Sequence, residues 1–533
     1  MAKRSKIFRK NIPKWLTVVI ALIILMPILM INGAYTGSSV DISGSLGVIS
    51  EDINIAYYAT SAGLAIAYPL MPHLRRVATT KNTILFSLCI QIVLSAICAE
   101  TDNMTLVLVC SFFIGFFKAF IMLEIISILM PIFSPDNKRS VYYSKFYPIT
   151  LSLSQLSMML TSELAYTYDW KYMYYFMIGL LLVAIIIVLL TFKYSPLTSI
   201  LPLINADWTS VVLASLYYLS VIFVATYGKT LGWFHSYDIF ISAFFIVPIT
   251  FTLFVRRQFI KEKPYADLNV MKNPNTFVGY IFVFFGMIFS STSSLVSSYV
   301  TSVLRLENNR LYGLNIFMLP GFLVAAAFCY WWFKKERKLN YIICIGYLCY
   351  IVSCTILYFT ISSQGEYQLL YLPTFLRGMG MMFTFVVFGV YVVQGLSPTQ
   401  MLSNVFLLIG VRSVLGPALG ASFFTNSIYR LQLATMQKLS ESISMTNPLA
   451  ASRYAQYYQS GIGKGFDPQQ AQQYALTNLY NLLQVQSLSV TLKTITGWLI
   501  IGGIILLIIV LIYPFHNHGK LMFSKLGKDV DVI

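Results

Sequence analysis

Apolar and polar stretches alternate along almost the whole chain. Each apolar stretch is close to the roughly 20 residues that a helix needs to cross a bilayer. Fourteen such segments occur, at about 14–35, 53–74, 82–99, 104–130, 142–165, 172–192, 206–227, 236–255, 275–299, 312–333, 340–362, 367–395, 401–424 and 494–514. The pattern predicts an all-α integral membrane protein with 14 transmembrane helices.

Composition supports a membrane protein and removes other classes. The chain has 533 residues, of which 57% are hydrophobic and 11% charged, and its mean hydropathy is +0.71. All seven cysteines fall inside apolar segments and outside any metal-ligand pattern, so we expect core residues, no metal site and no cofactor. The N-terminal apolar stretch is too long for a cleaved signal, which predicts an uncleaved first span.

The net charge of +17 is unevenly distributed between the connecting segments. Most Lys and Arg fall before the first span, near 75–81, 138–145, 256–272 and 334–338, and at the C-terminus. These segments lie on one side if the helices alternate in direction, and the positive-inside rule makes that side cytoplasmic. We therefore expect both termini in the cytoplasm, and a topology signal rather than nucleic-acid binding.

The segment 404–421 carries an arginine and a Gly-Pro pair inside an apolar run. On a regular helix Asn404, Arg412, Gly416 and Gly420 share one face, and Pro417 removes one helical hydrogen bond. An arginine deep in a bilayer costs at least about 3 kcal/mol, so it needs a partner or a watery cavity. Two interpretations stay open: a tight helix crossing with a paired arginine, or part of a solute path.

Internal correspondence predicts two six-helix halves separated by an inserted helix pair. Removing 206–255 aligns the fourth span with the twelfth and the fifth with the thirteenth. In the twelfth span Arg377 is followed by Gly378 and Gly380, and in the fourth Ser111, Gly115 and Lys118 share one face. The expected boundaries are 1–195, 196–272 for the inserted pair and linker, and 273–533, which includes a long periplasmic loop at 425–493.

These patterns resemble motifs of the major facilitator superfamily. Arg-x-x-x-Gly in a fourth helix and Gly-Pro-x-x-Gly-Gly in a fifth resemble its proton-relay and antiporter motifs, and the better matches here lie in the second half. YGKTLGWF at 227–234 and PYADLNVMKNPNTF at 264–277 are similar to segments of the fourteen-helix, Emr-type drug:proton antiporters. GSLG at 44–47, DWK at 169–171 and DPQQAQQYA at 467–475 also resemble that group.

The chain departs from this family pattern at coupling positions. Asn32 stands near the place where relatives commonly have an aspartate, and Ser111 where an arginine is expected. Lys118, on the same helix face as Ser111, is a possible substitute for that charge. The loop after the second span keeps basic residues but lacks the glycines and acid of the family motif.

Of the carboxylates within the predicted spans, Glu124 and Glu163 are the candidates for proton coupling. Coupling requires a titratable group that both sides can reach in turn, and a carboxylate commonly serves. For each, a structural or interfacial role is the alternative. The candidates for cavity or gating roles are Lys118, Arg377, Arg412, Asn32 and Gln155, each with interhelical packing as the alternative.

The long loop at 425–493 is polar and rich in Gln, Tyr and Ser. Asp467 followed by Pro468 is a good helix start, and a helix through 469–486 is expected. A connection of this length is usually functional, although a flexible connector is the alternative. We expect it to be a docking surface.

The resemblance implies a proton-driven exporter of amphipathic small molecules in the bacterial inner membrane, not an enzyme. It also implies a periplasmic adaptor and an outer-membrane channel as partners, besides protons and the lipid bilayer. No GxxxxGK[ST] segment is present, which argues against ATP as the direct driving force. A dedicated exporter of one lipid-like or siderophore-like metabolite, and a non-transporting receptor or scaffold, remain as alternatives.

Overall fold

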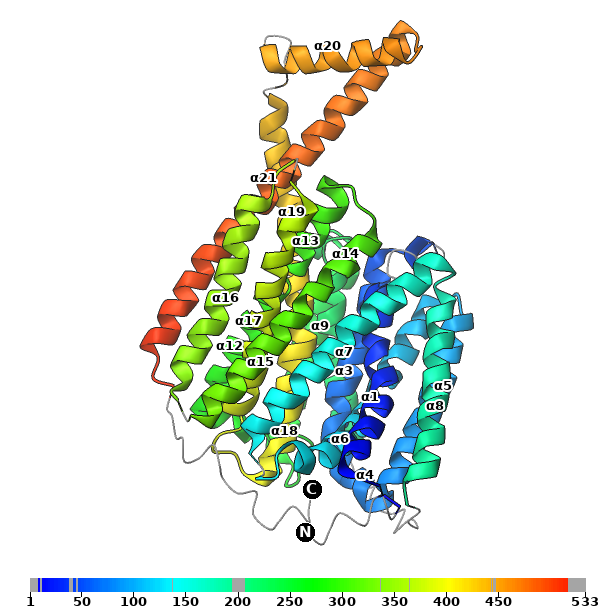
Figure 1. The fold of residues 1–533 in the computed structure, drawn as a ribbon, viewed down its shortest axis with the longest axis vertical. Coiled ribbons are helices and arrows are strands. Elements are labelled where there is room, and N and C mark those ends of the chain that lie inside the picture. Colours follow the sequence, from blue (N-terminus) through cyan, green and yellow to red (C-terminus); the bar gives the residue numbers. More distant parts are fainter. Residues whose placement is uncertain are drawn as a thin grey trace.

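The computed structural model describes residues 8–9, 12–37, 42–44, 47–136, 138–193, 207–335, 337–363, 365–441, 443 and 447–515. Apart from a β-bridge between Phe8 and Phe192, their regular structure is helical (Figure 1). The N-terminal group of helices is α1 (Lys14–Gly37), α3 (Ser50–Ala67), η2 (Tyr68–Leu70), α4 (Met71–Val77), α5 (Thr80–Glu100), α6 (Met104–Phe133), α7 (Arg139–Thr167) and α8 (Lys171–Thr191).

The inserted pair and the C-terminal group complete the fold. The inserted pair is α9 (Trp208–Tyr227) with η4 (Trp233–His235), α10 (Tyr237–Ile241), η5 (Ser242–Ile246) and α11 (Val247–Ile260). The C-terminal group is η6 (Leu268–Lys272), α12 (Pro274–Ser290), α13 (Ser293–Ser298), η7 (Tyr299–Val303), α14 (Asn308–Leu314), η8 (Asn315–Phe317), α15 (Met318–Lys334), α16 (Leu339–Thr360), η9 (Tyr367–Leu370), α17 (Tyr371–Tyr391), α18 (Pro398–Ile409), η10 (Gly410–Leu415), α19 (Gly416–Glu441), α20 (Pro448–Gly463) and α21 (Pro468–Ile512).

The predicted apolar segments all coincide with helices. Within the described residues, 11 helical segments are long and apolar enough to cross a membrane. The other three predicted segments, 14–35, 53–74 and 142–165, coincide with α1, α3 to α4, and α7. The all-α membrane fold is confirmed, and 14 as the number of crossings stays a prediction.

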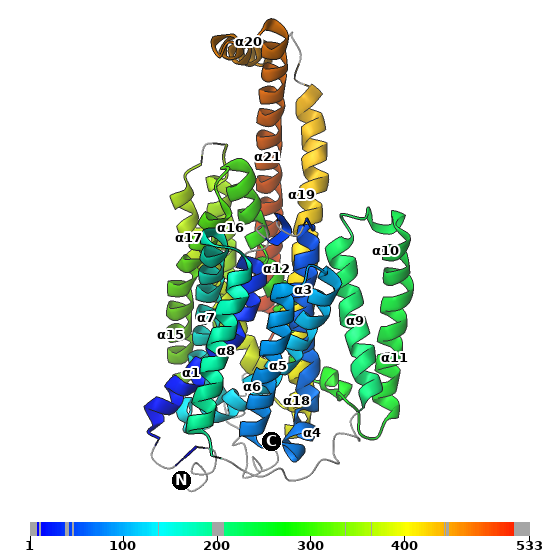
Figure 2. The same cartoon turned by 90° about the vertical axis from the view of Figure 1, so that its right-hand side faces the viewer.

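The N-terminal and C-terminal groups repeat one pattern of neighbours. In the first group α6 packs against α3 and α5, and α5 packs against α8; in the second α17 packs against α15 and α16, and α16 against α21. Two separate apolar cores accompany these groups, and a third joins α3 to α9 and to the end of α18. The inserted pair stands at one side of the bundle, beside α3 (Figure 2).

Glycines let the corresponding helix pairs approach backbone to backbone. An ideal Cβ on Gly115 of α6 would lie 1.8 Å from the Thr60 carbonyl oxygen of α3. An ideal Cβ on Gly378 of α17 would lie 2.8 Å from the Met318 carbonyl oxygen of α15. Both crossings therefore depend on glycine. Small residues commonly allow membrane helices to approach each other closely.

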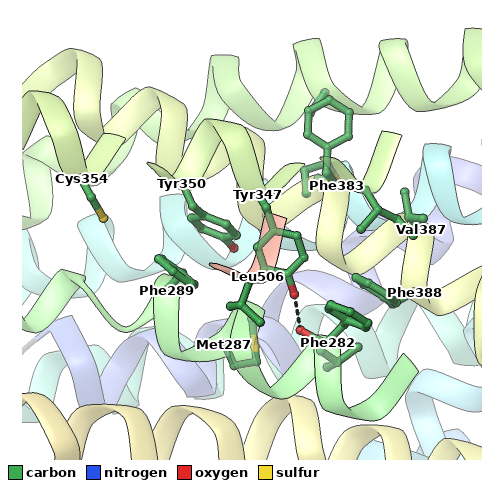
Figure 3. Close-up of a cluster of buried hydrophobic side chains, with 14 of the residues drawn as sticks. Phe282, Met287, Phe289, Tyr347, Tyr350, Cys354, Phe383, Val387, Phe388 and Leu506 are labelled. Atoms are coloured by element: carbon green, nitrogen blue, oxygen red, sulfur yellow. Dashed lines mark hydrogen bonds between the residues drawn. The ribbon is translucent and has the colours of Figure 1, made fainter. Parts of the chain in front are cut away.

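Aromatic side chains fill the C-terminal core (Figure 3). Tyr347 donates a 2.6 Å hydrogen bond to the Phe282 carbonyl oxygen, and Tyr350 stacks on Phe289 with ring centroids 5.6 Å apart. An ideal Cβ on Gly380 would lie 2.9 Å from the Tyr350 ring. The predicted motif glycine Gly380 therefore makes room for an aromatic side chain of α16.

The segment 425–493 is largely helical, which corrects its description as a loop. Asp467 accepts a 2.7 Å hydrogen bond from the Gln470 amide, and the Gln470 side chain bonds back to the Asp467 amide, so α21 begins with the predicted cap. Because no break follows, the expected helix at 469–486 and the last span form one helix of 45 residues. Helices α19, α20 and α21 project beyond the bundle (Figures 1 and 2); we name residues 425–493 the stalk.

Candidate functional site

Helix α7 contacts both groups of helices, and its inner face is the centre of the candidate site. It packs against α1 in the N-terminal group and against α15 and α17 in the C-terminal group. Tyr143, Tyr147 and Leu151 recur every four residues and pack on the C-terminal core. Gln155 follows on the same face and is half-buried. A polar helix in this place is typical of a surface turned towards the protein interior rather than lipid.

Arg412 contacts this face from the other group of helices. Its Nη1 donates a 3.1 Å hydrogen bond to the Tyr147 hydroxyl, and its guanidinium carbon lies 4.4 Å from the centroid of the Phe385 ring. A cation over a ring gains up to about 2 kcal/mol when both are desolvated. The Arg412 Nε is buried and has no hydrogen-bond partner in the described part of the chain.

The prediction that Asn404, Arg412, Gly416 and Gly420 share one helix face is wrong for Arg412. Asn404 accepts a 2.6 Å hydrogen bond from Tyr280 of α12, and Gly416 and Gly420 also lie against α12. Arg412 instead faces α7 and α17. The reason is η10, a π-helical turn that widens the helix between Asn404 and Gly416 and changes the direction of the intervening side chains.

Pro417 follows the π-helical turn and leads into α19. Its carbonyl oxygen accepts a hydrogen bond from the Tyr58 hydroxyl of α3 at 3.4 Å. Gly410, at the start of the turn, lies against Tyr218 of the inserted pair, since an ideal Cβ there would be 2.1 Å from the phenol oxygen. The Gly-Pro segment thus contacts α3, α9 and α12 on one side while Arg412 contacts α7 and α17.

Arg377 is buried, with 4% of its surface exposed. Its Nη2 lies 3.2 Å from Asn315 Oδ1 and 3.4 Å from Met318 Sδ, and its Nη1 is buried without a partner among the described residues. Asn315 in turn contacts Met158 of α7, with 3.6 Å between Nδ2 and Sδ. Through Asn315, Arg377 is also connected to the inner face of α7.

Lys118 lies in α6, close to the crossing with α3. Gly115 forms the crossing with Thr60, and Lys118, one turn further, is 1% exposed. Ser111, at the position where a family arginine was expected, donates its hydroxyl to the Val107 carbonyl oxygen of its own helix at 2.6 Å. The serine therefore supports the helix locally, and Lys118 is the buried cation of α6.

The two candidate carboxylates lie in different surroundings. Glu124 is 3% exposed and accepts a 2.9 Å hydrogen bond from Thr80, the first residue of α5. A helix N-terminus favours a negative charge. Glu163 lies one turn before the end of α7 and is exposed. The side chain of Asn32, in α1, lies outside the described part of the structure.

Sequence reasoning missed the partners that surround the arginines. Tyr147, Phe385 and Asn315 contact Arg412 or Arg377 directly. The period of four from Tyr143 to Leu151 was the available signal, because it marks one face of α7. Phe385 and Asn315 carried no comparable signal among the many aromatic and polar residues of their helices.

The fold is that of a multi-pass membrane protein, and the comparisons identify it as a transporter of a known family. Residues 15–421 match the sequence profile of the Major Facilitator Superfamily, so the chain belongs to that family. It is 22% identical over 473 residues to the colistin resistance protein EmrB of Acinetobacter baumannii, covering 85% of this chain and 87% of that protein.

A second relative is similar over part of the chain, and a solved structure is similar in fold. The lincomycin resistance protein LmrB of Listeria monocytogenes is 29% identical over 153 residues, which cover 28% of this chain and 31% of that protein. The fold is similar to the crystal structure of tetrameric PepTSo2, with a TM-score of 0.53, 13% identity, and coverage of 93% of this chain and 96% of that one. This last similarity concerns the fold alone.

Proposed function

We propose that this protein is a proton-driven exporter of amphipathic small molecules that works by alternating access across the bacterial inner membrane. The observation that carries the proposal is the contact between Arg412 and α7, where a cation of one group of helices lies on Tyr147 of the other. A cation and aromatic rings at a junction between two helix groups suit a path that opens when the groups move apart. The resistance proteins among its relatives favour drug export.

Under this proposal the two groups of helices correspond to two moving halves, 1–195 and 273–533, with 196–272 inserted between them. The repeated pattern of helix neighbours supports these boundaries. Both termini are then cytoplasmic, and the stalk is periplasmic.

Glu124 is the stronger candidate for the coupling carboxylate, because it is buried while Glu163 is exposed. The test uses purified protein in liposomes under an imposed pH gradient, with efflux of amphipathic dyes and proton flux followed together. We expect Glu124→Gln to abolish substrate-triggered proton flux.

The matched control is Glu262→Gln, at an exposed residue after α11, which should leave both fluxes unchanged. Glu163→Gln serves as the second coupling variant. Wild-type transport at a rate independent of the pH gradient would refute proton drive. Unchanged substrate-triggered proton flux in both Glu124→Gln and Glu163→Gln would refute a coupling role for these carboxylates.

We further propose that the stalk binds a periplasmic adaptor that leads to an outer-membrane channel. Exposed apolar side chains on the stalk, such as Leu449 and Leu476 at 77% and 51% exposure, support a docking role. Replacing residues 430–490 with a flexible linker should abolish co-purification of a co-expressed adaptor while the protein still inserts. Co-purification that survives the replacement would refute the docking role.

A further inference from the structure

The spanning helices of the C-terminal group contain one buried arginine, Arg377, and one half-buried arginine, Arg412, but no carboxylate. Helices α12, α15, α16, α17 and α18, with the turn η10, include Arg377 and Arg412 and lack Asp and Glu altogether. In a low-dielectric interior an ion without a counter-charge costs several kcal/mol. An anion supplied from outside these helices would therefore stabilise the two cations.

The neutral partners of each arginine leave one buried guanidinium nitrogen without an acceptor among the described residues. Arg377 has an amide oxygen and a thioether as acceptors, and Nη1 is left over. Arg412 has a phenol and a ring face, and Nε is left over. Both leftover donors are buried and have no acceptor in the described part of the chain. Buried donors are normally satisfied, so each marks a place for a missing acceptor.

Arg412 contacts α7 directly, and Arg377 is connected to the same face of α7 through Asn315, at a second depth. Arg412 contacts Tyr147, and Arg377 is connected through Asn315 to Met158. Tyr147 and Met158 are about 16 Å apart along α7, since each helical residue adds about 1.5 Å. Between and beside these points lie apolar and aromatic groups, including Leu151 and the Phe385 ring.

We propose that Arg377 and Arg412 select the substrate by its charge, so that the molecule exported along α7 is an amphipathic organic anion with a carboxylate, sulfonate or phosphate head group. The inference rests on the proposed export function and specifies its substrate class. A guanidinium offers paired donors that fit such a head group in a bidentate geometry. The aromatic and aliphatic side chains of α7 and α17 pack against the apolar tail.

The test compares decanesulfonate with decyltrimethylammonium, which share one tail and carry permanent, opposite charges. Transport is measured in liposomes, and binding is measured to the full-length protein in nanodiscs. We expect the wild type to prefer the sulfonate by at least about tenfold in both assays, because one charged hydrogen bond corresponds to a tenfold or larger change in affinity.

The variants are Arg377→Gln, Arg412→Gln and the corresponding Lys substitutions, with Arg256→Gln at an exposed position near the end of α11 as the control. We expect each Gln variant to lose about tenfold in sulfonate binding and transport while handling of the ammonium compound stays unchanged. The Lys variants should recover part of the sulfonate binding, and the control should behave as the wild type.

Equal or preferential handling of the ammonium compound would overturn the anion proposal while leaving the export function intact. An equal loss of both compounds in the Gln variants would also overturn it, because that result means a structural role. Arginine-dependent sulfonate binding without transport would refute the export function and retain the charge selection. Binding of neither compound in nanodiscs would overturn the anion proposal.

Discussion

The indole nitrogen of Trp233 donates a 3.0 Å hydrogen bond to Asn426 Oδ1. This contact joins the turn between α9 and α10 to α19. On the other side Tyr227, the last residue of α9 before this turn, donates its hydroxyl to the Asp52 carboxylate of α3. Because α3 and α19 belong to different groups of helices, this end of the inserted pair connects the two groups.

Removing the indole N–H should loosen this connection. Trp233→Phe keeps the ring but deletes the donor, and one hydrogen bond contributes about 1 kcal/mol, so a separated state should become about fivefold more populated. Spin labels at the exposed positions 49 and 425, on the α3 and α19 sides, would report this as a larger share of long distances. Phe234→Leu, at an exposed ring of the same turn, is the control, and distances identical to the wild type in Trp233→Phe would contradict the prediction.

At the other end of the inserted pair, Asp207 connects the start of α9 to two cations at the end of α11. Burial opposes its ionisation, but hydrogen bonds from Arg257, Ser210 and Lys261 outweigh this and hold the pKa of Asp207 well below its usual range. A lowered folded-state pKa contributes stability that is present above the unfolded value of about 4 and is lost as the pH falls further.

Asp207→Asn should therefore destabilise the protein at neutral pH by about 2 kcal/mol, as expected for charged hydrogen bonds. The difference between the wild type and this variant should narrow as the pH is lowered below about 4. Thermal unfolding across this pH range measures the difference directly. Asp238→Asn, at the N-terminal turn of α10, is the control, and a difference that stays constant with pH would rule out the linkage.

The crossing of α3 and α6 should not tolerate any side chain at Gly115. Gly115→Ala places a Cβ 1.8 Å from a backbone oxygen, so the helices must move apart, and overpacking costs about 1–3 kcal/mol. Gly179→Ala in α8 is the matched control, because no atom lies within 4 Å of an ideal Cβ there. The melting temperature in detergent should fall for Gly115→Ala only; equal values for both variants would show that the crossing can relax.

The start of α21 should depend on its cap. Asp467→Ala removes the hydrogen bond to the Gln470 amide and should cost about 1 kcal/mol locally. Hydrogen exchange at residues 469–472 should become about fivefold faster, while exchange in the spanning part of α21 stays unchanged. Asp467→Asn retains the acceptor, so its amide exchange rates should match those of the wild type. Exchange as fast in Asp467→Asn as in Asp467→Ala would argue against the cap.

The sequence was informative where one physical quantity dominates. Apolar length located the spanning helices, because a bilayer fixes that length, and the Asp467 cap was visible because it is a local bond. Arg412 was recognisable as unusual, but its partner Tyr147 lies 265 positions away. A π-helical turn, which no residue spacing indicated, decides which way Arg412 points. The sequence pattern also did not indicate that α19 continues into the stalk, because the part of α19 beyond residue 425 is polar.

The unbroken 45-residue helix α21 can transmit movement along its length as a rigid rod. It is about 67 Å long, and if about 30 Å lies in the bilayer, more than half of its length extends outside. Tilting the membrane part by about 10° would displace the far end by about 6 Å, by the geometry of a rod of that length. Rearrangement among the buried helices would thus be transmitted to the tip of the stalk as movement, without any change of structure inside α21.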